Sequence, residues 1–192
     1  MAAETSQMLP LGAPAPAFSL PDTCATVHSL DDAVGSQAYL VMFICNHCPF
    51  VIHVADELAR IGKDCQAKNV AVFAINSNDA SKYPADGAES MREVSAQRGY
   101  TFPYLIDAKQ DIAKAYYAAC TPDFYLFDSD RLLVYRGQMD GSRPGNSVAV
   151  DGVDIRRAID AVLAGEMVAE DQVPSIGCSI KWIAGNEPVS TA

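Results

Sequence analysis

Two cysteines and a histidine stand close together in the segment Cys45-Asn46-His47-Cys48-Pro49. Two thiols at this spacing can cycle between a dithiol and a disulfide, and the thiolate form of a cysteine is the species that attacks disulfide bonds. The imidazole of His47 can donate a hydrogen bond to a thiolate or place positive charge beside it. The segment therefore indicates redox chemistry in which the pKa of Cys45 is the decisive property.

The residues on either side indicate how the dithiol is positioned. Residues 38–44 form an apolar run rich in β-formers, which is typical of a buried strand in a parallel sheet. Pro49 suits the first turn of a helix, and apolar residues recur three and four apart over residues 50–68. Because a helix N-terminus carries partial positive charge, we expect this position, together with His47, to lower the pKa of Cys45.

A zinc site is the main alternative for two neighbouring cysteines, and a pair of inert buried side chains is another. A structural zinc site usually needs a second Cys or His pair at similar spacing. The sequence has no second C-x-x-C and no H-x-x-x-H, and its other cysteines are scattered singly at Cys24, Cys65, Cys120 and Cys178. We therefore expect redox chemistry with no metal and no cofactor, because a dithiol between a strand and a helix is the context that confirms such a motif.

Longer stretches of the chain resemble the thioredoxin superfamily, and more closely its peroxiredoxin-like branch, the AhpC/TSA or redoxin proteins. The segments that carry the resemblance are 11–22, 41–50, 70–76, 121–128 and 174–182. The last of these resembles the ending of an uncharacterised bacterial subgroup that carries the CNHCP motif. The resemblance implies a thioredoxin-like α/β fold with a central mixed sheet flanked by helices, a β-rich N-terminal extension and a C-terminal tail.

The resemblance also implies catalytic roles for the dithiol. Cys45 matches the nucleophilic cysteine of thioredoxins, and Cys48 matches the cysteine that resolves the mixed disulfide. A histidine directly before the second cysteine, here His47, is similar to the arrangement in disulfide isomerases and periplasmic oxidases. Because a low thiol pKa stabilises the reduced pair, we expect a dithiol more oxidising than that of thioredoxin.

A second group of residues is implied to bind the substrate. Pro122 matches the cis-proline that faces the dithiol in this superfamily. Thr121, directly before it, would offer its backbone to an extended substrate chain, and Asn46 is assigned to the same role.

Three positions depart from the patterns of the related families. Peroxiredoxins carry a threonine three residues before the peroxidatic cysteine, whereas Cys45 occupies that place relative to Cys48. They also use an arginine near the proline loop, but residues 120–128 contain none. Thioredoxins have a buried carboxylate where this chain has Tyr39. The sequence therefore predicts a thiol–disulfide oxidoreductase, with a thiol peroxidase of antioxidant type and a soft-metal-binding chaperone as alternatives.

Two of the single cysteines are candidates for additional redox thiols. Cys120 lies two residues before Pro122 and would approach the dithiol if the proline loop faces it. Cys178 lies in the C-terminal tail, where a cysteine can act as a resolving thiol. For Cys120 the alternative is a small buried apolar side chain, and for Cys178 it is packing against Trp182.

The pattern of the remaining chain predicts the other elements. Residues 77–87 are polar and indicate a loop. Two β-rich runs, at 123–128 and 131–137, have the spacing of a hairpin. Further elements are predicted as a strand at 70–76, a helix at 89–98, a strand at 104–106, and helices at 111–119 and 152–165.

Composition limits the classes of function. The chain has 192 residues and a net charge of −10, which suits one domain over residues 1–192 and argues against a nucleic-acid partner. Its first residues lack the pattern of a secretory signal, and no apolar run approaches the ~20 residues needed to span a membrane. We therefore expect a cytoplasmic protein. Its partners would be a protein or small-molecule disulfide and a thiol electron donor, while the oligomeric state stays open.

Overall fold

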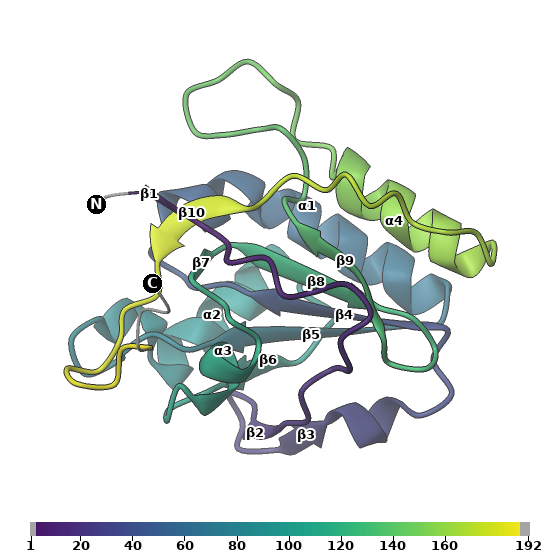
Figure 1. The fold of residues 1–192 in the computed structure, drawn as a ribbon. Helices are drawn as coiled ribbons and strands as arrows, with labels where there is room; N and C mark the ends of the chain where they lie inside the picture. Colours follow the sequence, from purple (N-terminus) through teal and green to yellow (C-terminus); the bar gives the residue numbers. More distant parts are fainter. Residues whose placement is uncertain (1–2, 189–192) are drawn as a thin grey trace.

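The computed structural model describes residues 3–188, and its largest sheet has five strands in the order β6-β5-β4-β8-β9 (Figure 1). β4, β5 and β6 run parallel to one another, while β8 and β9 are antiparallel to their neighbours. The strands are β4 (Ala38–Phe43), β5 (Val70–Asn76), β6 (Tyr104–Ile106), β8 (Asp123–Phe127) and β9 (Leu133–Gly137). The predicted central mixed sheet is confirmed.

The sheet is covered on both faces, which explains why all six residues of β4 are buried. Side chains of successive residues point to opposite faces of a strand. Accordingly, Leu40 and Met42 belong to one hydrophobic core, and Tyr39 and Val41 belong to the other.

Helices and the N-terminal segment pack against the two faces of the five-stranded sheet. α1 (Pro49–Ala67), α2 (Ala88–Arg98) and α4 (Val153–Leu163) contribute to the core on one face. The short helix α3 (Asp111–Ala115) and the N-terminal residues Leu9 and Phe18 contribute to the core on the other. This arrangement confirms the predicted flanking of the sheet by helices.

A second, three-stranded sheet joins the two ends of the chain to the middle. It has the order β1-β10-β7 and consists of β1 (Ala3–Thr5), β10 (Ile176–Ser179) and β7 (Cys120–Thr121). β10 pairs antiparallel with both neighbours and is seen beside β1 in Figure 1. The sequence predicted a tail here but no strand, because four residues that contain Gly and Ser carry little local β signal.

The remaining differences from the predicted elements lie at their ends. The helix predicted at 111–119 ends at Ala115, because Tyr117 adopts a left-handed backbone that a helix cannot continue through. The second hairpin strand begins at Leu133 rather than residue 131, since Arg131 has a positive φ in the turn. The N-terminal extension contains β2 (Ser19–Pro21) and β3 (Val27–Ser29), paired as a hairpin, followed by the 3-10 helix η1 (Leu30–Ala33).

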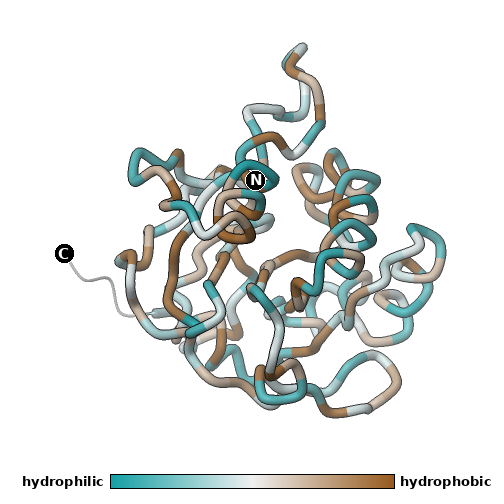
Figure 2. Tube along the Cα trace, turned by 90° about the vertical axis from the view of Figure 1, so that its right-hand side faces the viewer, coloured by the Kyte–Doolittle hydropathy of each residue, from teal (hydrophilic) through white to brown (hydrophobic). Residues whose placement is uncertain are grey.

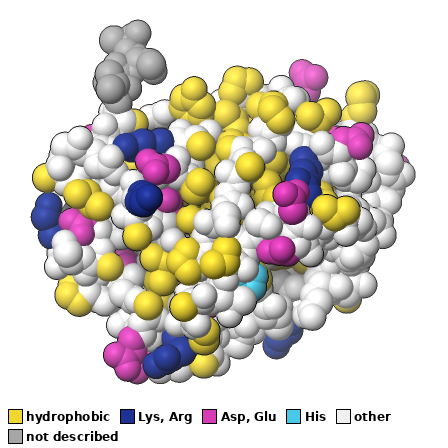
Figure 3. Space-filling model, turned by 90° about the horizontal axis from the view of Figure 1, so that it is seen from below, with side chains coloured by type: hydrophobic (Ala, Val, Ile, Leu, Met, Phe, Trp, Pro, Cys, Tyr) yellow, Lys and Arg dark blue, Asp and Glu magenta, His cyan; other side chains and the backbone are white. Residues whose placement is uncertain are grey.

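Hydrophobic and charged residues are distributed differently over the interior and the surface. The interior strands are largely hydrophobic, whereas the helices carry both hydrophobic and hydrophilic residues (Figure 2). On the face shown in Figure 3, basic and acidic side chains lie next to one another rather than gathering by sign. No helix within residues 3–188 is long and apolar enough to cross a membrane.

Candidate redox site

The dithiol lies between the carboxyl end of β4 and the first turn of α1. Cys48 is the N-cap residue of α1 and Pro49 is its first helical residue, as the sequence predicted. Both thiols are free, with only 2% of Cys45 and none of Cys48 exposed. The local sequence therefore folds as expected and leaves the pair just beneath the surface.

Thr121 contacts the sulfur atoms of both cysteines. Its hydroxyl lies 3.3 Å from the Sγ of Cys45, and the thiol of Cys48 donates to its carbonyl oxygen at 3.2 Å. The Thr121–Pro122 peptide bond is cis, in agreement with the family resemblance. The loop that the sequence placed opposite the dithiol is thus in direct contact with both cysteines.

Asp86, which the sequence analysis missed, organises the other side of Cys45. It lies in the 3-10 helix η2 (Pro84–Asp86), and its side chain is fully buried. One carboxylate oxygen lies 2.7 Å from the Nδ1 of His47, and the other accepts the backbone N–H of Asn46 at 2.8 Å. The imidazole also stacks on the ring of Tyr83, with centroids 5.0 Å apart. Its orientation is therefore determined from two directions.

The bond to Asp86 assigns a proton to the Nδ1 of His47, because an ionised carboxylate can only accept. The Nε2 is buried without a hydrogen-bond partner among the described residues. The sulfur of Cys45, a ring nitrogen of His47 and a carboxylate oxygen of Asp86 lie within 4.8 Å of one another. These atoms suit proton transfer at Cys45, and they also include the donor types that zinc accepts.

The two cysteines have opposite electrostatic environments. The hydrogen bond to Cys48, burial and the negative charge of Asp86 together raise the pKa of Cys45 well above its usual value. Hydrogen bonds from the thiols of Cys45 and Cys178, together with the backbone N–H of Val51, lower the pKa of Cys48 to about 4 despite its burial. The expected lowering of the pKa of Cys45 is therefore wrong, because the helix N-terminus acts on its N-cap residue, Cys48.

One contact works against the Cys48 thiolate. The carbonyl of Thr121 accepts the Cys48 S–H, and this bond is lost when Cys48 ionises. The thiols of Cys45 and Cys178 and the backbone N–H groups of Val51 and Cys178 nevertheless favour the thiolate. The balance leaves the negative charge on Cys48 and the proton on Cys45.

The structure treats the two additional cysteines differently. Cys178 lies opposite Thr121 in the β10–β7 pairing and belongs to the same buried core cluster as Cys45 and Cys48. Burial raises the pKa of Cys178 to about 11. The sulfur of Cys120 instead contacts the carbonyl oxygens of Pro122 (3.8 Å) and Ser175 (4.0 Å). Cys178 thus joins the dithiol directly, whereas Cys120 faces the backbone.

Asn46 holds the loop between the two cysteines in place. Its side-chain amide donates to the carbonyl of Ala85 at 2.7 Å and accepts from the hydroxyl of Tyr104 at 3.2 Å. These bonds attach the dithiol loop to η2 and to β6. The side chain that the sequence assigned to substrate binding is therefore engaged within the protein.

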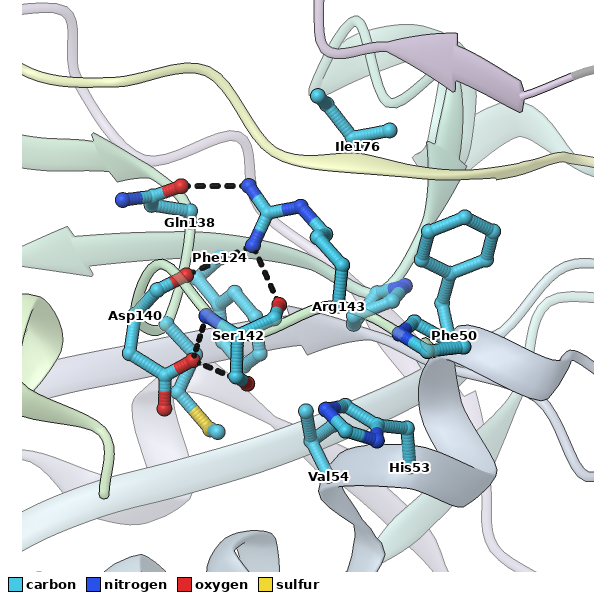
Figure 4. Close-up of a pocket in the computed structure, with 12 residues that line it drawn as sticks. Phe50, His53, Val54, Phe124, Gln138, Asp140, Ser142, Arg143 and Ile176 are labelled. Atoms are coloured by element: carbon cyan, nitrogen blue, oxygen red, sulfur yellow. Dashed lines mark hydrogen bonds between the residues drawn. The ribbon is translucent and has the colours of Figure 1, made fainter. Parts of the chain in front are cut away.

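A small cavity adjoins Pro122 and the first turns of α1 (Figure 4). Its volume of about 20 Å³ is enough for one water molecule. Arg143 lies across from Phe50 and His53, and its guanidinium donates to the side chain of Gln138 and to backbone carbonyls, including that of Asp140 at 2.8 Å. No arginine hydrogen-bonds a sulfur of the dithiol in the part of the chain that the structure describes.

The residues that the sequence missed, Asp86 and Tyr83, lie in the loop predicted at 77–87. One signal could have pointed to them. The loop follows β5, which runs parallel to β4, and the carboxyl ends of parallel strands meet at the same edge of a sheet. Polar residues after β5 are therefore expected near residues after β4, although no pattern in the loop identifies which of them turns inward.

Comparisons with known proteins identify the family and support the fold. A family model described as the AhpC/TSA family matches residues 11–136. The crystal structure of an uncharacterised conserved protein from Geobacillus kaustophilus is similar with a TM-score of 0.93 and 54% identity, covering 95% of this chain and 97% of that one. A hypothetical protein from Sinorhizobium meliloti 1021 gives a TM-score of 0.93 and 50% identity, covering 94% and 99%.

More distant structures share the fold alone. A thiol:disulfide interchange protein of the thioredoxin family from Chlorobium tepidum TLS has a TM-score of 0.62 at 16% identity, covering 81% of this chain and 99% of that one. A search of curated proteins found no significant match. The comparisons thus support the fold and the family at a coarse level.

Proposed function

Because the chain belongs to the AhpC/TSA family of thioredoxin-like redox proteins, we propose that it is a thiol–disulfide oxidoreductase that uses Cys45 and Cys48. One observation carries this proposal. The sulfurs of both cysteines meet at Thr121, directly before the cis-proline Pro122 and at the N-terminus of α1. The proposal takes residues 1–192 as one thioredoxin-like domain, as the sequence predicts.

Cys45 is the thiol that meets the substrate. Cys48 has no exposed surface and lies beneath Thr121, whereas Cys45 retains slight exposure. As Cys45 attacks a substrate disulfide, its proton passes to the Cys48 thiolate to which it is hydrogen-bonded. A mixed disulfide forms on Cys45 and one substrate thiolate leaves.

Cys48 completes the exchange. Its sulfur attacks the Cys45 side of the mixed disulfide, its proton passes to a departing substrate thiolate, and the Cys45–Cys48 disulfide forms. The substrate disulfide gains two electrons and the dithiol loses two. A thiol electron donor then returns the protein to its reduced form.

His47 and Asp86 adjust the ease with which Cys45 loses its proton. Asp86 holds His47 in one orientation, with a ring nitrogen of His47 within 4.8 Å of the sulfur of Cys45. The negative charge of Asp86 opposes a thiolate on Cys45. The reduced state is instead stabilised by the Cys48 thiolate, and this supports a pair more oxidising than that of thioredoxin.

A thiol peroxidase is the second candidate, and the low pKa of Cys48 favours it. A thiolate reacts with peroxide to give a sulfenic acid, which a neighbouring thiol resolves. A peroxide is small enough to approach a sulfur that a disulfide substrate cannot reach. No arginine hydrogen-bonds a sulfur of the dithiol among the described residues, and Arg143, which lines the cavity beside Pro122, bonds to Gln138 and to backbone carbonyls.

Trapping separates the two candidates. A Cys48→Ser variant cannot resolve a mixed disulfide, so we expect it to accumulate a stable adduct on Cys45 with a model disulfide substrate. Cys65→Ser is the matched control, because Cys65 is a buried thiol of the same helix with its pKa raised to about 12 by burial. Failure to trap an adduct, together with rapid sulfenic acid formation on Cys48 of the native chain after peroxide addition, would reject the oxidoreductase in favour of the peroxidase.

A further inference from the structure

Three cysteines, rather than two, lie next to Thr121. Cys45 approaches its hydroxyl and Cys48 its carbonyl oxygen, at 3.3 Å and 3.2 Å. Cys178 lies opposite the same residue in the β10–β7 pairing, and it belongs to the same buried core cluster as Cys45 and Cys48. Cys48 therefore has two thiols within reach, one from its own loop and one from the C-terminal strand.

The position of β10 is tightly specified. Gly177 packs directly against the backbone of Thr121, and a Cβ at this position would collide with the Thr121 carbonyl. The strand continues past the dithiol, with Ser179 opposite Cys120 and the N–H of Ile180 donating to the carbonyl of Ala119 at 3.0 Å. On its other side β10 pairs with β1 over three residues. Cys178 is thus held at the dithiol from both sides.

β10 also occupies the edge that an extended substrate would use. The sequence assigned the backbone of Thr121 to substrate binding, and in the structure that backbone pairs with Cys178. A substrate strand and β10 therefore compete for the same hydrogen bonds. In this structure β10, which carries the Cys178 thiol, therefore occupies the edge where an extended substrate would bind.

We propose that Cys178 is an internal disulfide partner of Cys48, so that the C-terminal strand acts as a built-in substrate of the dithiol. This proposal rests on the proposed function, which supplies the Cys45–Cys48 disulfide. The Cys178 thiol loses its proton as its sulfur attacks the sulfur of Cys48, the Cys45–Cys48 bond breaks, and a Cys48–Cys178 bond forms. The proton of Cys178 passes to the departing Cys45 sulfur. No electrons are gained or lost, and Cys45 returns to its thiol form.

The consequence is a second oxidised form of the protein. In the Cys45–Cys48 form, neither cysteine of the dithiol can attack a substrate. In the Cys48–Cys178 form, Cys45 is a free thiol again while β10 is covalently tied to α1. The protein can thus hold one disulfide and still present a nucleophile beside His47 and Asp86.

Cys120 provides the internal comparison. It is buried and lies in β7, the strand that pairs with β10, yet its sulfur is directed to the carbonyl oxygens of Pro122 and Ser175. Both cysteines are therefore close to the dithiol in the fold, but only Cys178 belongs to the same buried core cluster as Cys45 and Cys48. A Cys120→Ser variant is therefore the control for Cys178→Ser, because it removes a buried thiol near the dithiol that is not the proposed disulfide partner.

Disulfide mapping in a Cys45→Ser variant tests the proposal. This variant keeps five of the six cysteines, and oxidation with one equivalent of diamide is expected to remove two thiols and give a Cys48–Cys178 peptide in mass spectrometry. Adding Cys178→Ser should abolish the disulfide, while adding Cys120→Ser should leave it unchanged. A Cys48–Cys120 peptide, or no intramolecular disulfide, would overturn the assignment.

A measurement on the unmodified chain guards against an effect of the substitutions on folding. The oxidised protein is quenched with an alkylating reagent, and the fraction with alkylated Cys45 and a Cys48–Cys178 bond is determined. We expect both disulfides to be present at equilibrium. If only the Cys45–Cys48 bond is found, the internal partner is rejected while the proposed function stands. If the native chain also reduces no disulfide substrate, the proposed function fails with it.

Discussion

The two sides of the dithiol differ in what they offer a sulfur atom. On the η2 side, Cys45 faces the carboxylate of Asp86, which opposes a negative charge. On the β10 side, Cys48 faces the N-terminus of α1 and the thiol of Cys178, which favour one. The two cysteines of the motif thus lie in different electrostatic surroundings. As a result, Cys45 is a thiol in the reduced protein and Cys48 is a thiolate.

According to this asymmetry, Cys48 carries the negative charge of the reduced dithiol. Titration of the reduced protein is the most direct test of that assignment. The pKa of Cys48 is lowered from 9.0 to about 4, so its thiolate persists through the neutral range. We expect the thiolate absorbance in the ultraviolet to show one group that ionises near pH 4. The step should vanish in Cys48→Ser and remain in Cys178→Ala at a higher pH, because one donor to the sulfur is then lost.

The same shift predicts the sign of a stability effect. A group whose pKa is lower in the folded state stabilises that state above the unfolded pKa, and the gain is lost as the pH falls through the folded pKa. Cys48 should therefore stabilise the reduced protein fully above pH 9 and progressively less between pH 9 and about 4. A low-pH step that survives in Cys48→Ser and disappears in Cys45→Ser would reverse the assignment.

The β10 side can be disturbed without touching a sulfur atom. Gly177→Ala would drive a Cβ into the backbone of Thr121, which cannot yield as a flexible side chain can. We expect a loss of about 1–3 kcal/mol in the free energy of unfolding. We also expect a higher pKa of Cys48, because β10 moves away. Chemical denaturation and thiolate titration measure the two effects.

Gly141→Ala is the matched control for this prediction. A Cβ at Gly141 meets only the side chain of Val148 at 3.7 Å, an ordinary contact. Its effect on stability should stay within about 0.5 kcal/mol. Equal stability of the two variants would show that β10 is not held against Thr121.

The features of the site that sequence could predict are local in origin. The apolar run before Cys45 and the proline after Cys48 predicted a strand and a helix N-terminus, and the structure has β4 and α1 there. The cis form of the Pro122 bond followed from the family resemblance rather than from its neighbours. These features depend on residues close in sequence or on a shared pattern.

The features that escaped prediction depend on contacts between distant segments. Asp86 lies 39 residues from His47, in a loop with no distinctive pattern. β10 has a weak β signal of its own and is a strand because β1 and β7 offer it hydrogen bonds from both sides. The order of the thiol pKa values could not be predicted either, because it follows from these same contacts. The position of the dithiol could thus be predicted from the sequence, but the charged and polar groups that surround it could not.

The η2 side is tested by removing the charge of Asp86 while keeping its shape. Asp86→Asn keeps the shape of the side chain and one oxygen that can accept the backbone N–H of Asn46, but it carries no negative charge beside Cys45. We expect the pKa of Cys45 to fall and its alkylation at neutral pH to become about tenfold faster, which corresponds to one pKa unit. Asp140→Asn is the control, since Asp140 is another buried carboxylate that accepts backbone N–H groups, from Ser142, Asp151 and Gly152. If both variants alkylate Cys45 at the native rate, the charge of Asp86 does not govern this thiol, and burial and the bond to Cys48 alone keep it protonated.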